Sequence, residues 1–187
     1  MADTIFETGR LVLRTEAPGD LDWWMENMNT PAVMRHLAGV QPREVFESKF
    51  ARNAAGIAES GLGFWFMVLR DTGELVGHSG MCPIISPHAP EALQGHPQIG
   101  WALAERFWRR GLALEAARAV LARGFGHFGF DTIYAQTSDS NLASTAMMGR
   151  LGLRRVPELD YADPDFPAQD NPTTIYAISR DAWRADQ

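Results

Sequence analysis

The sequence is short of cysteine, with Cys82 alone among 187 residues. A single cysteine cannot form an internal disulfide, which is typical of proteins that work in a reducing compartment. Its apolar neighbours favour a buried, unreactive thiol over a nucleophile. Because His36, His88 and His127 show no spacing with cysteine or carboxylates that is typical of a metal site, we expect no bound metal.

Long apolar runs and a surplus of cationic residues are missing as well. No window approaches the roughly 18 uninterrupted apolar residues of a membrane span, and no signal peptide, a basic stretch followed by an apolar run, opens the chain. The formal net charge of −6 disfavours nucleic-acid binding, because phosphate contacts need a cationic surface. We expect a cytoplasmic protein with neither a membrane nor a nucleic acid as partner.

What is present suits one globular domain. Hydrophobic residues make up 45% of the chain and charged residues 21%, as in ordinary globular proteins. A chain of 187 residues can bury a core that needs neither a metal nor a disulfide. Since no repeat, low-complexity tract or linker divides it, the sequence predicts a single domain over residues 1–187. A monomer and a homodimer both remain open.

Alternating or uniformly apolar segments predict about seven strands. They lie at residues 9–15, 64–69, 75–84, 98–103, 132–137, 153–156 and 174–179. Apolar residues at helical spacing predict helices. These lie at residues 21–28, 42–60, 111–125 and 141–151. Proline-rich loops are expected at residues 86–97 and 157–172.

The order strand, helix, strand at residues 98–103, 112–125 and 132–137 indicates a right-handed crossover between parallel strands. The flanking hairpins are antiparallel. The predicted fold class is therefore α/β (α+β), with a mixed, mostly antiparallel central sheet and flanking helices. Ligands favour the place where the two kinds of pairing meet, so we expect a ligand cleft between the two parallel central strands.

The segment from Trp108 to Ala113 joins the first of these strands to the crossover helix. A helix start offers unpaired N–H groups and a partial positive charge, which together bind an anion. Gly111 lets the backbone approach a ligand closely, and Arg109 and Arg110 add positive charge. The segment is predicted to cradle a pyrophosphate, and a surface loop with a glycine cap is the alternative. It lacks the glycines of a Rossmann fingerprint and the lysine of a P-loop.

Several runs of the chain resemble the GNAT superfamily of N-acetyltransferases. The run IGWAL at residues 99–103 and the run FWRRGLA at 107–113 resemble its cofactor motif. DSNLAS at residues 139–144 and RLGL at 150–153 resemble its next segment.

One branch of that superfamily is the most similar. Trp108, the pair Asn141 and Ser144, and the opening run TGRLVLR at residues 8–14 resemble the ribosomal-protein N-terminal (Rim-type) acetyltransferases. The likeness extends from Thr8 to about Leu153, so it covers most of the chain.

The resemblance implies an acetyl-CoA site with named contacts. The pyrophosphate would be held by main-chain N–H groups of the cradle, contributed by Arg109, Arg110, Gly111, Leu112 and Ala113. The pantetheine arm would lie along the backbone of Trp101, Ala102 and Leu103, where one N–H would meet the thioester carbonyl in an oxyanion-type contact. Asn141 would contact the cofactor arm, with Ser144 one turn further on. The alternative role for Asn141 is that of a helix cap.

The sequence departs from the superfamily at its usual proton carriers. Gln98 stands where many members have a glutamate base, and Met148 stands where many have a tyrosine acid. The candidate catalytic residues are therefore Gln98 itself, Ser144 as the acid that the Rim-type resemblance suggests, and His78 as a base if it faces the cleft. A capping serine and a packed histidine are the alternatives.

The predicted function is transfer of an acetyl group from acetyl-CoA to a primary amine by direct attack, on a protein N-terminus or a small molecule. At pH 7 an α-amine loses its proton at a cost of roughly 1–1.4 kcal/mol, whereas a lysine side chain costs nearly 5 kcal/mol. A site without a strong base therefore favours an α-amine. The missing glutamate and tyrosine leave open a non-catalytic acyl-CoA binding or sensor domain.

Overall fold

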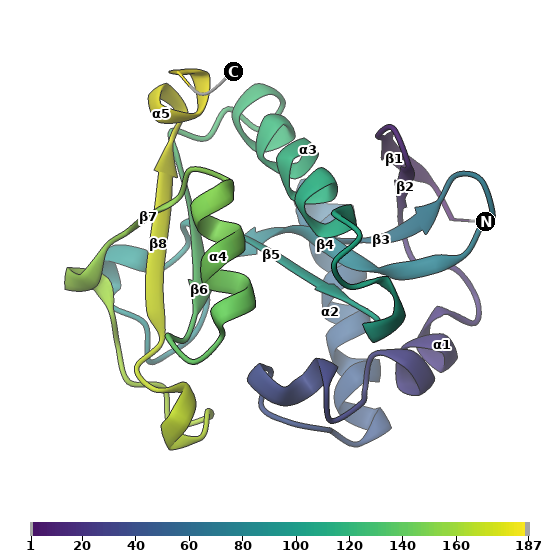
Figure 1. The fold of residues 1–187 in the computed structure, drawn as a ribbon, viewed down its shortest axis with the longest axis horizontal. Coiled ribbons are helices and arrows are strands. Elements are labelled where there is room, and N and C mark those ends of the chain that lie inside the picture. Colours follow the sequence, from purple (N-terminus) through teal and green to yellow (C-terminus); the bar gives the residue numbers. More distant parts are fainter. Residues whose placement is uncertain (1, 186–187) are drawn as a thin grey trace. The chain divides into compact units, whose positions relative to one another are not determined.

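The computed structural model of the protein describes residues 2–185. Within them the chain forms one sheet of eight strands in the order β1-β2-β3-β4-β5-β6-β8-β7, with helices beside it (Figure 1). The strands are β1 (Thr4–Glu7), β2 (Leu11–Arg14), β3 (Gly63–Leu69), β4 (Leu75–Pro83), β5 (Pro97–Leu103), β6 (Thr132–Thr137), β7 (Arg154–Arg155) and β8 (Thr174–Ser179). The α-helices are α1 (Asp20–Asn27), α2 (Arg43–Ser60), α3 (Leu112–Gly126), α4 (Leu142–Arg150) and α5 (Arg180–Ala185). The mixed, mostly antiparallel α/β fold is as predicted.

The chain divides into two compact units. One comprises Met1–Gly80 with Trp101–Ala119, and the other comprises Met81–Gly100 with Val120–Gln187. The boundaries fall inside β4, β5 and α3, so these three elements run through both units. The single domain over residues 1–187 stays a prediction.

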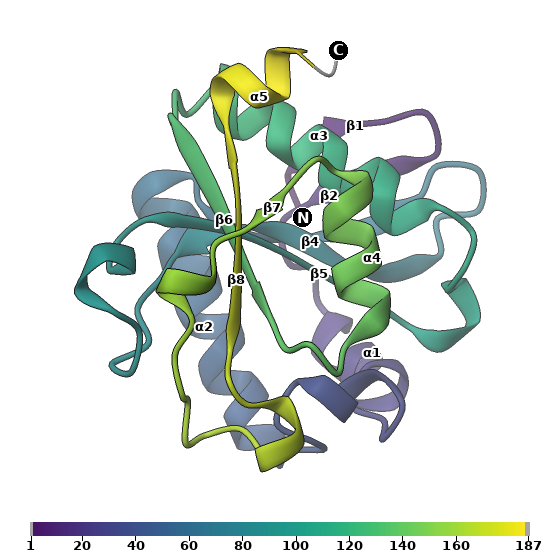
Figure 2. The same cartoon turned by 60° about the vertical axis from the view of Figure 1, so that its left-hand side comes forward.

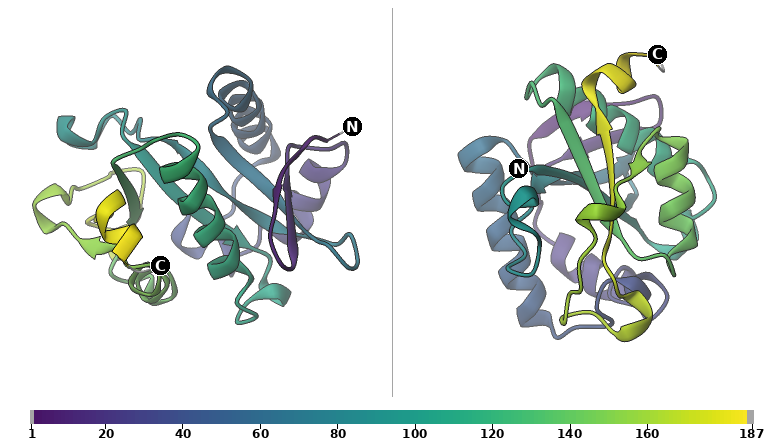
Figure 3. Two further views of the ribbon diagram at one scale, coloured as in Figure 1. Left: turned by 90° about the horizontal axis from the view of Figure 1, so that it is seen from above. Right: turned by 90° about the vertical axis from the view of Figure 1, so that its left-hand side faces the viewer.

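In the first unit, a hairpin of β1 and β2 continues into β3 by antiparallel pairing, with Leu11 opposite Leu69. α2 lies beside β3 (Figure 3). The Asn53 side chain ties the two together, because it accepts a hydrogen bond from the Phe64 N–H at 2.7 Å and donates one to the Phe64 carbonyl at 2.9 Å. α2 ends at Gly61, which adopts a left-handed φ of 75°.

β4 and β5 approach each other closely at Gly77. A Cβ at this position would lie 2.1 Å from the Ala102 carbonyl oxygen, and the φ of Gly77 is 155°. One step further, the Ala104 N–H donates to the Val76 carbonyl at 3.0 Å. Main chain therefore meets main chain here, and a residue without a side chain is required.

Gly77→Ala is expected to lower the free energy of unfolding by about 3 kcal/mol, since neither backbone can retreat from the added methyl group. Gly126→Ala is the matched control, because an added Cβ at the end of α3 meets no atom within 4 Å. The control is expected to stay within about 0.5 kcal/mol of the wild type. Urea unfolding midpoints of the two variants check this, and equal midpoints would contradict it.

In the second unit, β5 and β6 are parallel, with Gln98 opposite Tyr134 as the paired position. The predicted parallel pair is thus confirmed. β6 and β8 pair antiparallel along their whole length, from Thr132 opposite Ser179 onward. α4 lies beside β6 (Figure 2), and the short β7 pairs with the outer side of β8.

Local structure differs from the expectations at four places. The strand expected at 9–15 is β2 and is shorter, because Thr8 to Arg10 form the turn between β1 and β2. β1 was missed because its four residues bury no side chain fully and so lack a clear alternation. α5 was missed because six residues are too few to show a helical period. β7 is shorter than the expected strand at 153–156.

Among the described residues, none of the helices is both long and apolar enough to span a bilayer.

Candidate cofactor and active site

The turn before α3 has an unusual backbone. Arg109 has a φ of 59° and Gly111 a φ of 75°, so two residues of the turn are left-handed. Left-handed residues at such a turn expose successive N–H groups in a concave arrangement that suits an anion. For Arg109 this conformation costs about 1–2 kcal/mol, and strain of this kind clusters at ligand-binding sites.

The start of α3 adds further donors to this turn. The Glu115 N–H donates to the Gly111 carbonyl at 3.1 Å, which is the first helical hydrogen bond. The N–H groups of Leu112 to Leu114 come before it and have no partner within the helix. A Cβ on Gly111 would have the Arg10 Nη2 atom, at 3.5 Å, as its nearest neighbour. The predicted cradle therefore has the open backbone that an anion site needs.

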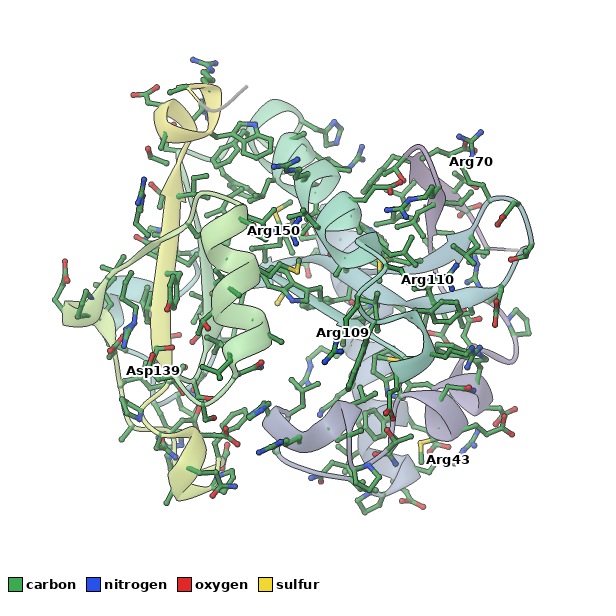
Figure 4. All side chains as sticks on the ribbon, in the orientation of Figure 1. Arg43, Arg70, Arg109, Arg110, Asp139 and Arg150 are labelled. Carbon is green, nitrogen blue, oxygen red and sulfur yellow. The ribbon has the colours of Figure 1, made fainter. Side chains whose placement is uncertain are left out.

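Side chains hold the turn in place from both sides. The Trp108 indole N–H donates to the Leu103 carbonyl at 2.8 Å, and Arg10 donates from Nη1 to the Arg110 carbonyl at 2.9 Å. Phe107, one residue earlier than Trp108, is buried. The side chains of Arg109 and Arg110 are exposed at the turn (Figure 4). No pattern in the sequence indicated the contact of Arg10 with this turn.

Two carbonyl groups at the end of β5, where the pantetheine arm was expected, already face other parts of the protein. The Ala102 carbonyl faces β4 at Gly77, and the Leu103 carbonyl accepts from Trp108. Trp101 and Ala102 are half-buried, and Leu103 is buried. A contact between this strand and a pantetheine arm stays a prediction.

Gln98 belongs to a chain of polar side chains in the second unit. Its Oε1 atom accepts from Gln136 Nε2 at 2.7 Å, and Gln136 Oε1 accepts from the Tyr161 hydroxyl at 2.6 Å. Gln98 Nε2 lies 3.7 Å from the sulfur of Cys82, which is half-buried. Burial and then the charge of Asp163 raise the pKa of Tyr161, so the phenol keeps its proton and acts as the donor. These donor and acceptor roles determine which side of the Gln98 amide and of the Gln136 amide carries the oxygen.

Asn141 and Ser144 form a helix cap. Asn141 precedes α4, and its side-chain oxygen accepts from the Ser144 N–H at 3.2 Å. This is the capping alternative that the sequence left open, and both residues are half-buried. Met148, one turn further on, is buried, and a thioether has no proton to donate. The cofactor contacts of Asn141 and Ser144 stay predictions.

The family model of the acetyltransferase (GNAT) domain matches residues 10–154 of the chain. The chain belongs to the GNAT acetyltransferases.

Individual relatives agree with this family. An N-acetyltransferase of Bacillus subtilis that is described as uncharacterized, YoaA, is 27% identical over 154 residues, which are 81% of this chain and 83% of that protein. The crystal structure of an acetyltransferase from Agrobacterium tumefaciens is similar with a TM-score of 0.75 and 27% identity, covering 94% of both chains.

A fungal relative has a named reaction. The FsC-acetyl coenzyme A-N(2)-transacetylase of Aspergillus fumigatus is 27% identical over 113 residues, or 59% of this chain. The match spans only 48% of that protein. With the family match, these relatives show that this GNAT domain is an enzyme of the acyltransferase class.

His78, the candidate base of the GNAT domain, lies among aromatic rings of the first unit. Its ring is 4.6 Å from that of Trp24 and stacks on Phe64 at 4.8 Å. Burial, and then the positive charge of Lys49, lower the pKa of His78 to about 3. The imidazole is therefore neutral at pH 7 and binds a proton weakly. The packed-histidine alternative fits this environment better than a general base does.

Folding also brings His88 close to two carboxylates that lie far from it in the sequence. His88, Asp163 and Asp165 have potential ligand atoms within 4.8 Å of one another. Asp163 is buried, whereas the other two residues are exposed. Sequence spacing showed no relation between His88 and a carboxylate, because His88 lies in the loop at 86–97 and both aspartates lie in the loop at 157–172.

The low pKa of His78 predicts a pH-dependent stability. The unfolded chain takes up this proton below about pH 6.5, whereas the folded protein takes it up only near pH 3. Between these values the unfolded state binds one more proton, so the free energy of unfolding falls as the pH falls, by up to about 1.4 kcal/mol per pH unit. His78→Phe keeps the aromatic packing and should flatten this slope. Urea titrations of both proteins at a series of pH values measure it, and identical slopes would refute the assignment.

Proposed function

We propose that this enzyme transfers an acetyl group from acetyl-CoA to a primary amine by direct attack on the thioester carbonyl. The observation that carries the proposal is the left-handed pair Arg109 and Gly111 at the open start of α3. In the reaction, the amine nitrogen forms a bond to the carbonyl carbon and the carbon–sulfur bond breaks. The amine loses one proton, and the CoA thiolate gains one.

The cofactor would be held by main-chain and side-chain groups of this chain. The backbone N–H groups from Arg109 to Ala113 would bind the pyrophosphate, and the two arginines of the cradle would add attraction at longer range. The backbone of Trp101 to Leu103 would receive the pantetheine arm. Asn141 and Ser144 would contact that arm from α4. CoA supplies the acetyl group as a reactive thioester.

The chemistry of the candidate proton carriers narrows the acceptor. An amide such as Gln98 cannot take a proton, and His78 holds one only near pH 3. Ser144 has a hydroxyl proton to give, so it is our candidate acid for the thiolate. An α-amine, of which roughly a tenth is already free base at pH 7, needs no strong base. We therefore propose an α-amine, such as a protein N-terminus, as the acceptor, in agreement with the Rim-type resemblance.

Gly111→Asp tests the pyrophosphate cradle. Aspartate tolerates the left-handed conformation, and an added Cβ has room at this position, so the variant should fold. Two like charges about 4 Å apart repel by about 1–4 kcal/mol near a protein surface, so CoA should bind at least about fivefold more weakly. Gly111→Asn is the control with nearly the same shape and no charge, and it should lose less affinity. Calorimetric titration with CoA measures both, and wild-type affinity in Gly111→Asp would rule out the cradle.

A panel of amines tests the acceptor class. Peptides with a free N-terminus and no lysine should be acetylated faster near pH 7 than N-acetylated peptides with one lysine, because the lysine amine costs about 3–4 kcal/mol more to deprotonate. Release of free CoA thiol gives the rates. Equal rates would contradict the preference. CoA binding without turnover of any amine would favour a sensor domain instead.

A further inference from the structure

The turn between β1 and β2 contacts the start of α3 through one carboxylate. Glu115 accepts from the Thr8 hydroxyl at 2.6 Å and from the Arg10 main-chain N–H at 2.7 Å, both at Oε1. Its other oxygen, Oε2, accepts from Arg10 Nε at 2.6 Å. Nη1 of the same guanidinium donates to the Arg110 carbonyl at 2.9 Å. We propose that Arg10 and Glu115 are positioning residues that set the geometry of the pyrophosphate cradle, an inference that rests on the proposed function.

Peptide geometry explains how a contact to a carbonyl can position a donor. The Arg110 carbonyl and the Gly111 N–H belong to one peptide unit, and in a planar trans peptide they point in opposite directions. Arg10 holds this carbonyl at 2.9 Å. The Gly111 N–H is therefore turned away from Arg10, and the peptide cannot flip without losing that hydrogen bond. Because the residues on either side of Arg110 are left-handed, a flip of the peptide between Arg110 and Gly111 is the change by which the cradle would lose its shape.

Glu115 in turn fixes the guanidinium. Arg10 is half exposed, with 52% of its side chain accessible, whereas Glu115 is 21% accessible. An exposed arginine alone would sample many rotamers, but bonds to its Nε and its main-chain N–H leave it one arrangement. Burial raises the pKa of Glu115, while the hydrogen bonds from Thr8 and Arg10 and the arginine charge lower it, and the net shift is downward. The carboxylate is thus ionised at neutral pH.

The proposal predicts the opposite sign from simple electrostatics. Glu115 is a negative charge near the start of α3, so neutralising it should strengthen the binding of a diphosphate if only charge mattered. The contacts of Arg10 with Glu115 and with the Arg110 carbonyl form a clamp on the cradle. If Glu115 acts by positioning Arg10, neutralising Glu115 releases this clamp and weakens CoA binding. One substitution, Glu115→Gln, therefore separates the two mechanisms by direction.

The experiment titrates CoA into the wild type, Glu115→Gln and Glu47→Gln. Glu47 pairs with Arg43 at 3.1 Å on the exposed side of α2, so its variant loses a comparable surface ion pair away from the cradle. We expect Glu115→Gln to bind CoA about tenfold more weakly, as for the loss of one charge-assisted hydrogen bond, and Glu47→Gln to match the wild type. Unchanged or tighter binding by Glu115→Gln would overturn the inference.

Two further measurements show whether a loss of CoA affinity is specific to the diphosphate. Pantetheine, which lacks the diphosphate, should bind the wild type and Glu115→Gln equally, whereas a general disruption of the fold would weaken both ligands. Arg10→Lys keeps the charge but loses the planar fork, so it should reproduce the loss of CoA affinity, and it decides the matter if Glu115→Gln does not fold. Wild-type affinity for CoA in a folded Arg10→Lys variant would overturn the inference.

The same titrations distinguish a failure of the proposed function from a failure of this further inference. If the wild type itself does not bind CoA, the proposed function fails and the clamp with it. If the wild type binds CoA and Gly111→Asp does not, while Glu115→Gln binds as the wild type does, the cradle stands and only the clamp is refuted.

Discussion

Cofactor binding as we propose it depends on a few backbone N–H groups at the start of α3 that are left without helical partners. An α-helix always has such groups, but here the turn before it also places Arg109 and Gly111 in left-handed conformations. The surrounding contacts, from Trp108 on one side and Arg10 on the other, prevent this strained backbone from relaxing. Rigid donors lose little entropy when an anion binds, and this is the physical advantage of a cradle that is built before the ligand arrives.

The candidate catalytic residues of this protein are poor proton carriers. By the GNAT resemblance Gln98 stands where many members have a glutamate, and its amide is bound into a chain that ends at the protonated phenol of Tyr161. His78 is neutral at pH 7 because burial, and then the positive charge of Lys49, lower its pKa to about 3. An enzyme of this kind can position two reactants, and positioning alone supplies a large share of a rate enhancement. The α-amine that we propose as the acceptor is the kind of amine that such an enzyme could use, because it loses its proton at neutral pH more easily than a lysine side chain does.

Local patterns in the sequence predicted most of the fold. The strands at 132–137 and 174–179 have the predicted bounds because β-branched and aromatic residues alternate there, and the crossover from β5 to β6 is parallel as expected. Gly111 is left-handed at the start of α3, where the cradle was placed, and its binding of a pyrophosphate stays a prediction. Other features depend on tertiary contacts: the pairing of Arg10 with Glu115 and the enclosure of His78 join residues far apart in the chain. No local pattern contains that information.

The central claim is that main-chain N–H groups of the cradle bind the diphosphate of CoA. It is tested most directly by following the backbone amide resonances of uniformly ¹⁵N-labelled protein as CoA is added. The amide protons of Gly111, Leu112 and Ala113 should shift downfield as they donate hydrogen bonds to the diphosphate, and pantetheine should leave them where they are. Saturation with CoA while these three resonances stay unmoved would contradict the account.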